Sequence, residues 1–126
     1  MSSKDFGRAG EDIACRYLKK QNYQIIERNF FYNGGEIDII AFDIEKNELV
    51  FFEVKTRSNK AYGLPSESVD NFKIKRILRG AKFYMHIHSL ENVFVRFDVL
   101  ELFFVNDRYL VNHLKQILWN HIDVLD

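Results

Sequence analysis

The sequence predicts a mixed α/β fold in which helices pack on one β-sheet, in the order α-β-β-β-α-β. Apolar residues recur at helical spacing in two segments, and β-branched and aromatic residues dominate the stretches around and between them. The chain has 126 residues, of which 47% are hydrophobic, so we expect one domain spanning residues 1–126 with a single core. Helices and strands mixed in this way pack in layers around such a core.

The first two elements are a helix and a short strand. Residues 4–21 carry apolar side chains on one helical face, which predicts a helix that packs against the rest of the domain. Residues 23–29 then predict a short strand. The apolar face of the helix consists of Phe6, Gly10, Ile13, Ala14, Tyr17 and Leu18.

A β-hairpin follows. Gly34 and Gly35 mark a turn, and residues 35–43 and 48–57 are rich in β-branched and aromatic side chains, which favours two strands. The four residues 44–47 between them predict the hairpin turn. The second of these strands is almost continuously apolar from Leu49 to Val54, as expected of a strand that is covered on both faces.

A second helix and further strands complete the chain. A loop that contains the single proline covers residues 58–66, and helical spacing returns over residues 66–88. Residues 92–104 and 109–111 predict strands, and residues 113–120 predict a final short helix. The second helix has an apolar stripe of Ile74, Ile77, Leu78, Ala81 and Met85 and a basic face of Lys75, Arg79 and Lys82.

Basic residues are concentrated in one segment of this neutral protein. Residues 54–88 carry eight Lys or Arg against two acidic residues, a local charge of +6. Such a segment attracts phosphate groups, although a solvated helix face explains the same charges. No apolar run approaches the roughly 18 residues needed to span a bilayer, so we expect no membrane partner. With Cys15 as the single cysteine and no signal-peptide pattern, we expect a cytoplasmic location.

Three charges interrupt the hairpin: Asp38, Glu53 and Lys55. Glu53 and Lys55 share a strand face, because strand side chains alternate with period two. If Asp43 faces Glu48 across the four-residue turn, Asp38 lies opposite Glu53, whereas a tighter turn places Asp38 opposite Lys55. Either of these registers gathers the three charges on one patch, whereas a register shifted by one residue would separate Asp38 from Glu53.

Two carboxylates at cross-strand distance repel each other, so the patch needs compensation. A shared proton, the Lys55 ammonium or a divalent cation with oxygen ligands would each supply it. The alternative is a structural ion pair on a half-solvated sheet face, which is commoner than a functional site. Charges within a strand that is covered on both faces are costly unless they have partners or a role, and this favours a site.

The same residues resemble a known signature. Asp38 followed by Glu53-Val54-Lys55 resembles the PD-(D/E)XK nuclease superfamily, except that Ile37 stands where the proline would be. Four spaced motifs, GRAGEDIACRYL, GEIDIIA, FFEVKTR and SVDNFKIKRI, resemble the YraN family of small bacterial proteins, which are predicted nucleases similar to archaeal Holliday-junction resolvases. The resemblance covers residues 6–98 and implies a restriction-endonuclease-like fold, a mixed sheet flanked by helices.

The resemblance also implies roles for individual residues. Glu11 would join Asp38 and Glu53 as ligands of Mg²⁺ or Mn²⁺, and Lys55 would position the attacking water or help to deprotonate it. These four residues form the expected catalytic set. Lys73 and Arg76 match basic positions of the family and would bind nucleic acid.

Two neighbouring residues are interpreted from the sequence itself. Arg57 lies two residues beyond Lys55 and is a candidate phosphate contact, with an ordinary surface arginine as the alternative. Glu36 is interpreted as pointing away from Asp38, where it would cap or pair rather than catalyse.

The function expected from these observations is metal-dependent hydrolysis of DNA phosphodiester bonds, on branched or structured DNA. A homodimer is the assembly that the resolvase resemblance suggests. One alternative is a nucleic-acid-binding module that does not cleave, and another is a protein-interaction domain on a nuclease-like fold. Metal-dependent cleavage separates the first from the others, and salt-sensitive binding separates the second from the third.

Overall fold

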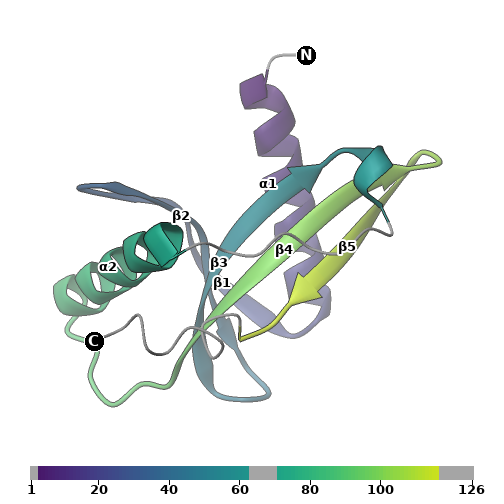
Figure 1. Cartoon of the computed structure of the whole chain (residues 1–126). Coiled ribbons are helices and arrows are strands. Elements are labelled where there is room, and N and C mark those ends of the chain that lie inside the picture. Colours follow the sequence, from purple (N-terminus) through teal and green to yellow (C-terminus); the bar gives the residue numbers. More distant parts are fainter. Residues whose placement is uncertain (1–2, 63–70, 117–126) are drawn as a thin grey trace.

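The computed structural model describes residues 3–62 and 71–116 of the chain. Its elements follow the order helix, three strands, helix, two strands, and a short 3-10 turn comes after the third strand (Figure 1). They are α1 (Ser3–Lys20), β1 (Tyr23–Tyr32), β2 (Gly35–Asp43), β3 (Glu48–Arg57), η1 (Asn59–Ala61), α2 (Asn71–Ile87), β4 (Val95–Val105) and β5 (Arg108–Leu114).

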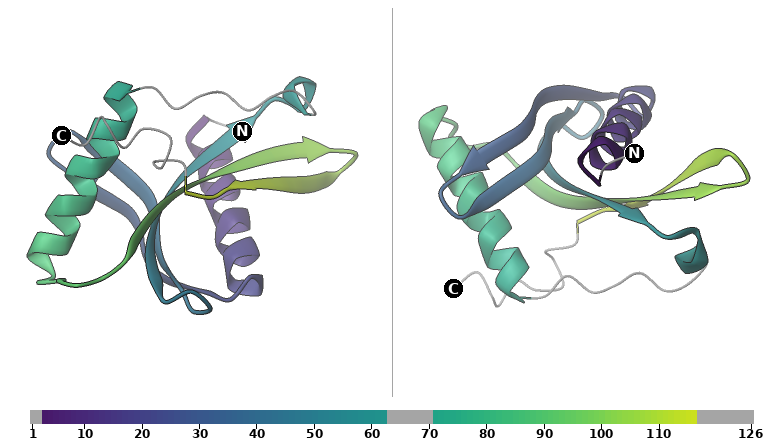
Figure 2. Two further views of the ribbon diagram at one scale, coloured as in Figure 1. Left: turned by 60° about the horizontal axis from the view of Figure 1, so that its bottom comes forward. Right: turned by 90° about the horizontal axis from the view of Figure 1, so that it is seen from above.

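The five strands form one mixed sheet in the order β1-β2-β3-β4-β5. Neighbouring strands are antiparallel except β3 and β4, which are parallel and are joined by the connection that contains α2. Helices α1 and α2 cover opposite faces of the sheet (Figure 2). The predicted mixed α/β class and element order are confirmed, and the short strand predicted over residues 109–111 is observed as the longer β5, which follows β4.

Two apolar cores explain why β3 is hydrophobic almost throughout. On the α2 side, Leu49 and Phe51 pack with Ala81 of that helix, and on the α1 side, Val50 and Phe52 pack with Leu18. Full burial of one such large side chain contributes about 1.5–3 kcal/mol. The predicted α2 stripe is confirmed for the members whose side chains are described, Ile77, Leu78, Ala81 and Met85.

Several predicted boundaries differ from the structure. The strand predicted over residues 23–29 continues to Tyr32, although Asn29 has a φ of 54°. The final helix predicted over residues 113–120 is wrong at its start, because His113 and Leu114 pair with β4 as part of β5. Residues 115–116 are not helical either, whereas residues 117–120 of that predicted helix and the proline-containing part of the 58–66 loop lie outside the described residues.

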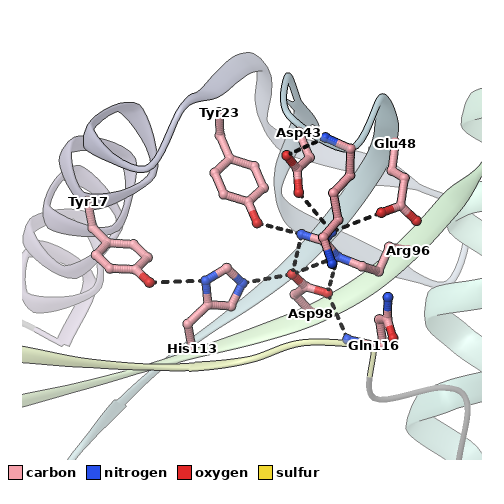
Figure 3. A network of polar contacts seen from close by, with 9 residues as sticks. Tyr17, Tyr23, Asp43, Glu48, Arg96, Asp98, His113 and Gln116 are labelled. Carbon is pink, nitrogen blue, oxygen red and sulfur yellow. Dashed lines mark hydrogen bonds and ion pairs between the residues drawn. The ribbon is translucent and has the colours of Figure 1, made fainter.

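A buried polar network joins the strands at the end of the sheet near the β2–β3 turn (Figure 3). Its centre is Arg96, which is 2% exposed and whose Nε lies 3.0 Å from Asp98 Oδ1. Arg96 Nη1 reaches Asp43 Oδ2 at 2.8 Å and Glu48 Oε1 at 3.2 Å. His113 Nε2 lies 2.7 Å from Asp98 Oδ2, so the last described strand is tied into the same network.

In the described part of the chain, no helix has both the length and the apolar character needed to cross a bilayer.

Candidate functional site

Asp38 lies where β2 separates from β3. The pairing of these strands runs from Asp43 opposite Glu48 to Ile39 opposite Phe52 and stops there. The β1–β2 pairing continues beyond it to Gly35, so the β1–β2 hairpin leaves β3 and reaches toward α2 (Figure 2). The four-residue turn of the first predicted register is therefore observed, and the tighter alternative is excluded.

At this fork the Asp38 carboxylate accepts a hydrogen bond from a backbone amide of β3. Val54 N donates to Asp38 Oδ2 at 2.8 Å, so the carboxylate satisfies an amide of β3 just beyond the last β2–β3 pair. A buried amide needs such a partner. One carboxylate oxygen is thus fixed by the fold.

The strand is also irregular at Asp38. Ile37 packs in the α2-side core and Ile39 in the α1-side core, although residues two apart share a face in a regular strand. The backbone therefore turns between these two residues. Face assignments from strict alternation fail across this point.

Three carboxylates meet beside the fork. Glu11 of α1 and Glu36 and Asp38 of β2 each offer one oxygen, and these oxygens all lie within 4.8 Å of one another. Oxygens on opposite sides of a cation with bond lengths of about 2.0–2.6 Å are separated by similar distances. The three residues could therefore hold one divalent cation.

Glu36 corrects an interpretation made from the sequence. It was expected to point away from Asp38, yet its carboxylate belongs to the same group. Period-two alternation was the signal that could have found it, because residues 36 and 38 are two apart. Glu11, in contrast, lies where the family resemblance placed it, beside Asp38.

Glu53 lies near this group without belonging to it. Its side chain is half-buried with Oε2 buried, and its charge contributes to the environment of Asp38. Val54 packs in the α1-side core, so Glu53 and Lys55 point to the other face of β3 and share it, as predicted. Lys55 is half-buried and pairs in register with Glu101 of β4.

Burial and mutual repulsion disfavour the ionised forms of Asp38 and Glu36 in this group. Burial raises the pKa of Asp38 to about 7, and the Val54 amide opposes this shift. The negative charges of Glu11, Glu36 and Glu53 raise the Asp38 pKa further. Burial and the Glu11 charge also raise the pKa of Glu36. A proton or a cation in the group would relieve this repulsion.

Two arginines near the site are engaged by acidic side chains. Arg28 Nη2 lies 2.7 Å from Asp12 Oδ1 and 3.8 Å from Glu11 Oε2. Arg57 Nη1 lies 2.7 Å from Glu101 Oε2, and the Arg57 side chain is 14% exposed. Arg57 thus ties β3 to the buried Glu101 of β4, a structural role that the sequence did not predict.

The basic face of α2 lies next to the β1–β2 turn. Side-chain atoms of Arg76 and Arg79 come within 3.5–3.6 Å of where a Cβ on Gly35 or Gly34 would be. Both arginines are exposed, as are Lys75 and Lys82, which confirms the predicted basic face. Lys73 lies in the first turn of α2.

Tyr32 holds the tip of the β1–β2 hairpin against α2. Its hydroxyl donates to the Arg76 carbonyl at 2.6 Å, and its ring lies against Gly80. The turn that Arg76 and Arg79 border leads directly into Glu36 and Asp38, so cations and carboxylates lie on either side of one hairpin tip. Arg79 was expected only as a member of the basic face, and its spacing of three from Arg76 was the available signal.

Comparison with known proteins places the chain in a family. Residues 10–102 match the profile of "Uncharacterised protein family UPF0102". The chain belongs to UPF0102. A UPF0102 protein of Clostridium perfringens is 45% identical over 90% of this chain and 93% of its own length. UPF0102 proteins of Bacteroides thetaiotaomicron and Caldanaerobacter subterraneus are 40% and 39% identical, over 91% and 94% of this chain and 93% and 95% of their own lengths.

The YraN-like relationship predicted from the four motifs is confirmed at the level of UPF0102. The matched region includes the residues discussed for the site, which are Glu11, Glu36, Asp38, Glu53 and Lys55. The structure titled "Crystal structure of SSO0001" aligns with 98% of this UPF0102 chain, which spans 59% of that chain. The TM-score is 0.35 and the identity 16%, a level at which the likeness carries no argument.

Proposed function

We propose that this protein is a divalent-metal-dependent nuclease that hydrolyses DNA phosphodiester bonds. The observation that carries the proposal is the meeting of Glu11, Glu36 and Asp38 within reach of one cation, beside the fork between β2 and β3. The likeness of Asp38, Glu53 and Lys55 to the PD-(D/E)XK signature supports the same reaction.

The donor set fits Mg²⁺ or Mn²⁺, which prefer carboxylate oxygens together with water or phosphate oxygens. Glu11, Glu36 and Asp38 would hold the ion, and Glu53 lies near enough to act on Asp38. When bound, such an ion neutralises charge on the phosphate and acidifies water.

The protein's own residues would do the positioning. The Val54 amide donates to Asp38 Oδ2 and thereby fixes the position of the Asp38 carboxylate. The ammonium of Lys55 would orient the attacking water or bind a phosphate oxygen, because it shares a strand face with Glu53. We expect Arg76, Arg79 and Lys73 of α2 to bind backbone phosphates, which position DNA without reading its sequence. Arg57 would add less, because Glu101 already engages it.

The substrate preference and assembly follow from the resolvase resemblance alone. It favours branched or structured DNA and a homodimer in which two sites meet two strands. The expected cytoplasmic location is compatible with such a substrate and stays a prediction.

A cleavage assay tests the proposed function. Linear and branched DNA are incubated with the wild type and with Asp38→Asn, in Mg²⁺, in Mn²⁺ and in EDTA. We expect metal-dependent cleavage by the wild type and a loss of at least about 100-fold in the variant, as when one preorganised charge-stabilising group is removed. Asp107→Asn, an exposed acid in the β4–β5 turn, is the control. Equal rates for wild type and Asp38→Asn would reject this site.

The second candidate function is DNA binding without cleavage, and the exposed row of Lys75, Arg76, Arg79 and Lys82 favours it. It predicts binding that weakens steeply with salt, no cleavage with any metal, and no effect of Asp38→Asn beyond a small electrostatic change. Absence of binding at low salt would exclude this candidate and leave the protein-interaction alternative.

A further inference from the structure

Phe31 places a large aromatic ring beside the carboxylate group. It pairs with Glu36 across the β1–β2 hairpin, and directly opposed residues of an antiparallel pair point to the same face. The preceding pair, Phe30 and Ile37, is buried together in the α2-side core. Phe31 therefore points the other way, to the side on which Glu36 meets Glu11.

The Phe31 ring is 70% exposed. Core packing does not account for it, because the neighbouring Phe30 supplies the buried aromatic ring of this strand. Single exposed apolar residues are common on protein surfaces. Phe31 differs from such residues in its position, next to three carboxylates that could hold a metal ion.

The hairpin tip that carries Phe31 is held in place. The next residue, Tyr32, donates its hydroxyl hydrogen to the Arg76 carbonyl, and its ring fills the space over Gly80 of α2. The ring of Phe31 is thus presented from an anchored backbone, which lowers the entropy cost of using it as a contact surface.

We propose that Phe31 stacks on an unpaired base of the DNA. This base would lie next to the phosphate that the metal ion held by Glu11, Glu36 and Asp38 would contact. The substrate class is then DNA with single-stranded or locally unpaired nucleotides at the cleavage point, and this inference rests on the proposed function. Aromatic rings bind bases through their π-faces whatever the sequence. Within a continuous duplex those faces are covered by neighbouring bases, so a surface ring reaches them only where stacking is interrupted.

The arrangement of charges fits the same substrate. Arg76 and Arg79 lie against the turn on the α2 side of the hairpin, and Phe31 stands on the opposite side. A single strand crossing the hairpin tip would place its phosphates against the arginines and a base against Phe31. Both contacts are independent of sequence, so the recognition would depend on strand structure.

Binding measurements test the role of Phe31. Fluorescence anisotropy in EDTA, where nothing is cleaved, compares a single-stranded oligonucleotide, a continuous duplex and a duplex with a short gap, at one fixed low salt concentration. The variants are Phe31→Ala and Phe31→Trp. The control is Phe94→Ala, because Phe94 is 76% exposed and lies just before β4, at the end of the sheet far from Glu53. Cleavage of the same substrates with Mn²⁺ is measured in parallel.

We expect Phe31→Ala to weaken binding of the single-stranded and gapped DNA by at least about fivefold, the lower end for loss of one stacked base, and to leave the duplex nearly unchanged. Phe31→Trp should retain the preference for single-stranded and gapped DNA over the duplex. The fluorescence of a 2-aminopurine placed in the gap should be quenched when Phe31→Trp binds and not when Phe31→Ala binds. Equal losses on all three DNAs, or the same loss in Phe94→Ala, would overturn the stacking role.

The two proposals fail in different ways. If the wild type binds and cleaves DNA while Phe31→Ala keeps the wild-type preference in both assays, the stacking role alone is rejected. If the wild type neither binds any of the three DNAs nor cleaves them, the proposed function falls and this inference falls with it.

Discussion

At the scale of single residues, the carboxyl group of Asp38 decides how the site responds to pH. Burial raises its pKa to about 7, so between about pH 4 and pH 7 the folded protein holds a proton that the unfolded chain has released. Stability therefore falls as pH rises through this window. Above it, the folded state carries an ionised carboxylate among three other acids.

Asp38→Asn should remove this pH dependence, because asparagine cannot ionise and its carbonyl can still accept from Val54 N. In EDTA, we expect the free energy of unfolding to fall between pH 5 and pH 8 by about 2–4 kcal/mol more in the wild type than in the variant. Urea unfolding at the two pH values measures this difference. Parallel pH profiles for the two proteins would contradict the raised pKa.

Glu36 gives a second prediction at this scale. Substitution of residues that merely orient metal ligands typically lowers affinity 10- to 100-fold, so Glu36→Gln should weaken Mn²⁺ binding by at least about tenfold. Calorimetric titration measures the affinity, with Glu45→Gln in the exposed β2–β3 turn as the matched control. Unchanged affinity in Glu36→Gln would remove Glu36 from the proposed ligand set.

At the scale of elements, the contact between α2 and the β1–β2 hairpin is narrow and tightly packed. A Cβ on Gly80 would lie under 3.0 Å from several atoms of the Tyr32 ring, so the ring or the helix would have to move. Gly80→Ala should therefore destabilise the protein by about 1–3 kcal/mol, although alanine favours the helix itself.

A double-mutant cycle separates these two effects. In the Tyr32→Leu background the clash is absent, and Gly80→Ala should become neutral or stabilising. Thermal or urea unfolding of the four proteins gives the coupling energy. Additive effects would show that Tyr32 does not limit the space at Gly80.

The elements themselves differ in how far the sequence predicts them. The hairpin strands Gly35–Asp43 and Glu48–Arg57 were predicted to the residue, because a polar turn separates two stretches of strong β-propensity. The helix predicted from His113 was wrong at its start because His113 and Leu114 pair with β4, and such pairing between distant strands overrides local spacing. Glu36 was misassigned even though alternation was readable, and the backbone turn at Asp38 depends on the fork, which no local pattern records.

At the scale of the whole molecule, the Arg96 network joins α1 and all five strands. Arg96 and Asp98 lie on β4, and their partners come from α1 and the other four strands (Figure 3). These partners are Tyr17, Tyr23, Asp43, Glu48 and His113. The sequence carried a hint, because Arg96 and Asp98 alternate within an apolar strand. Their partners were not predictable, because they come from segments that only the folded sheet brings together.

Arg96→Met should be strongly destabilising. It would leave Asp43, Glu48 and Asp98 without their shared guanidinium, and breaking a buried ion pair on one side typically costs about 3–5 kcal/mol. Denaturant unfolding measures the loss, with the exposed Arg108→Met as a control that should stay within about 0.5 kcal/mol of the wild type. A comparable small change in Arg96→Met would show that the acids find compensation elsewhere.

The three carboxylates belong to two separate parts of the chain. Glu11 comes from the first helix, whereas Glu36 and Asp38 come from the hairpin that follows it. An ion shared by these residues would be a reversible cross-link that closes a loop of about 25 residues, and such closure restricts the unfolded chain more than the folded one. The ion would then fasten the N-terminal helix to the sheet, and slower amide hydrogen exchange along that helix would report its arrival before any phosphodiester bond is cut.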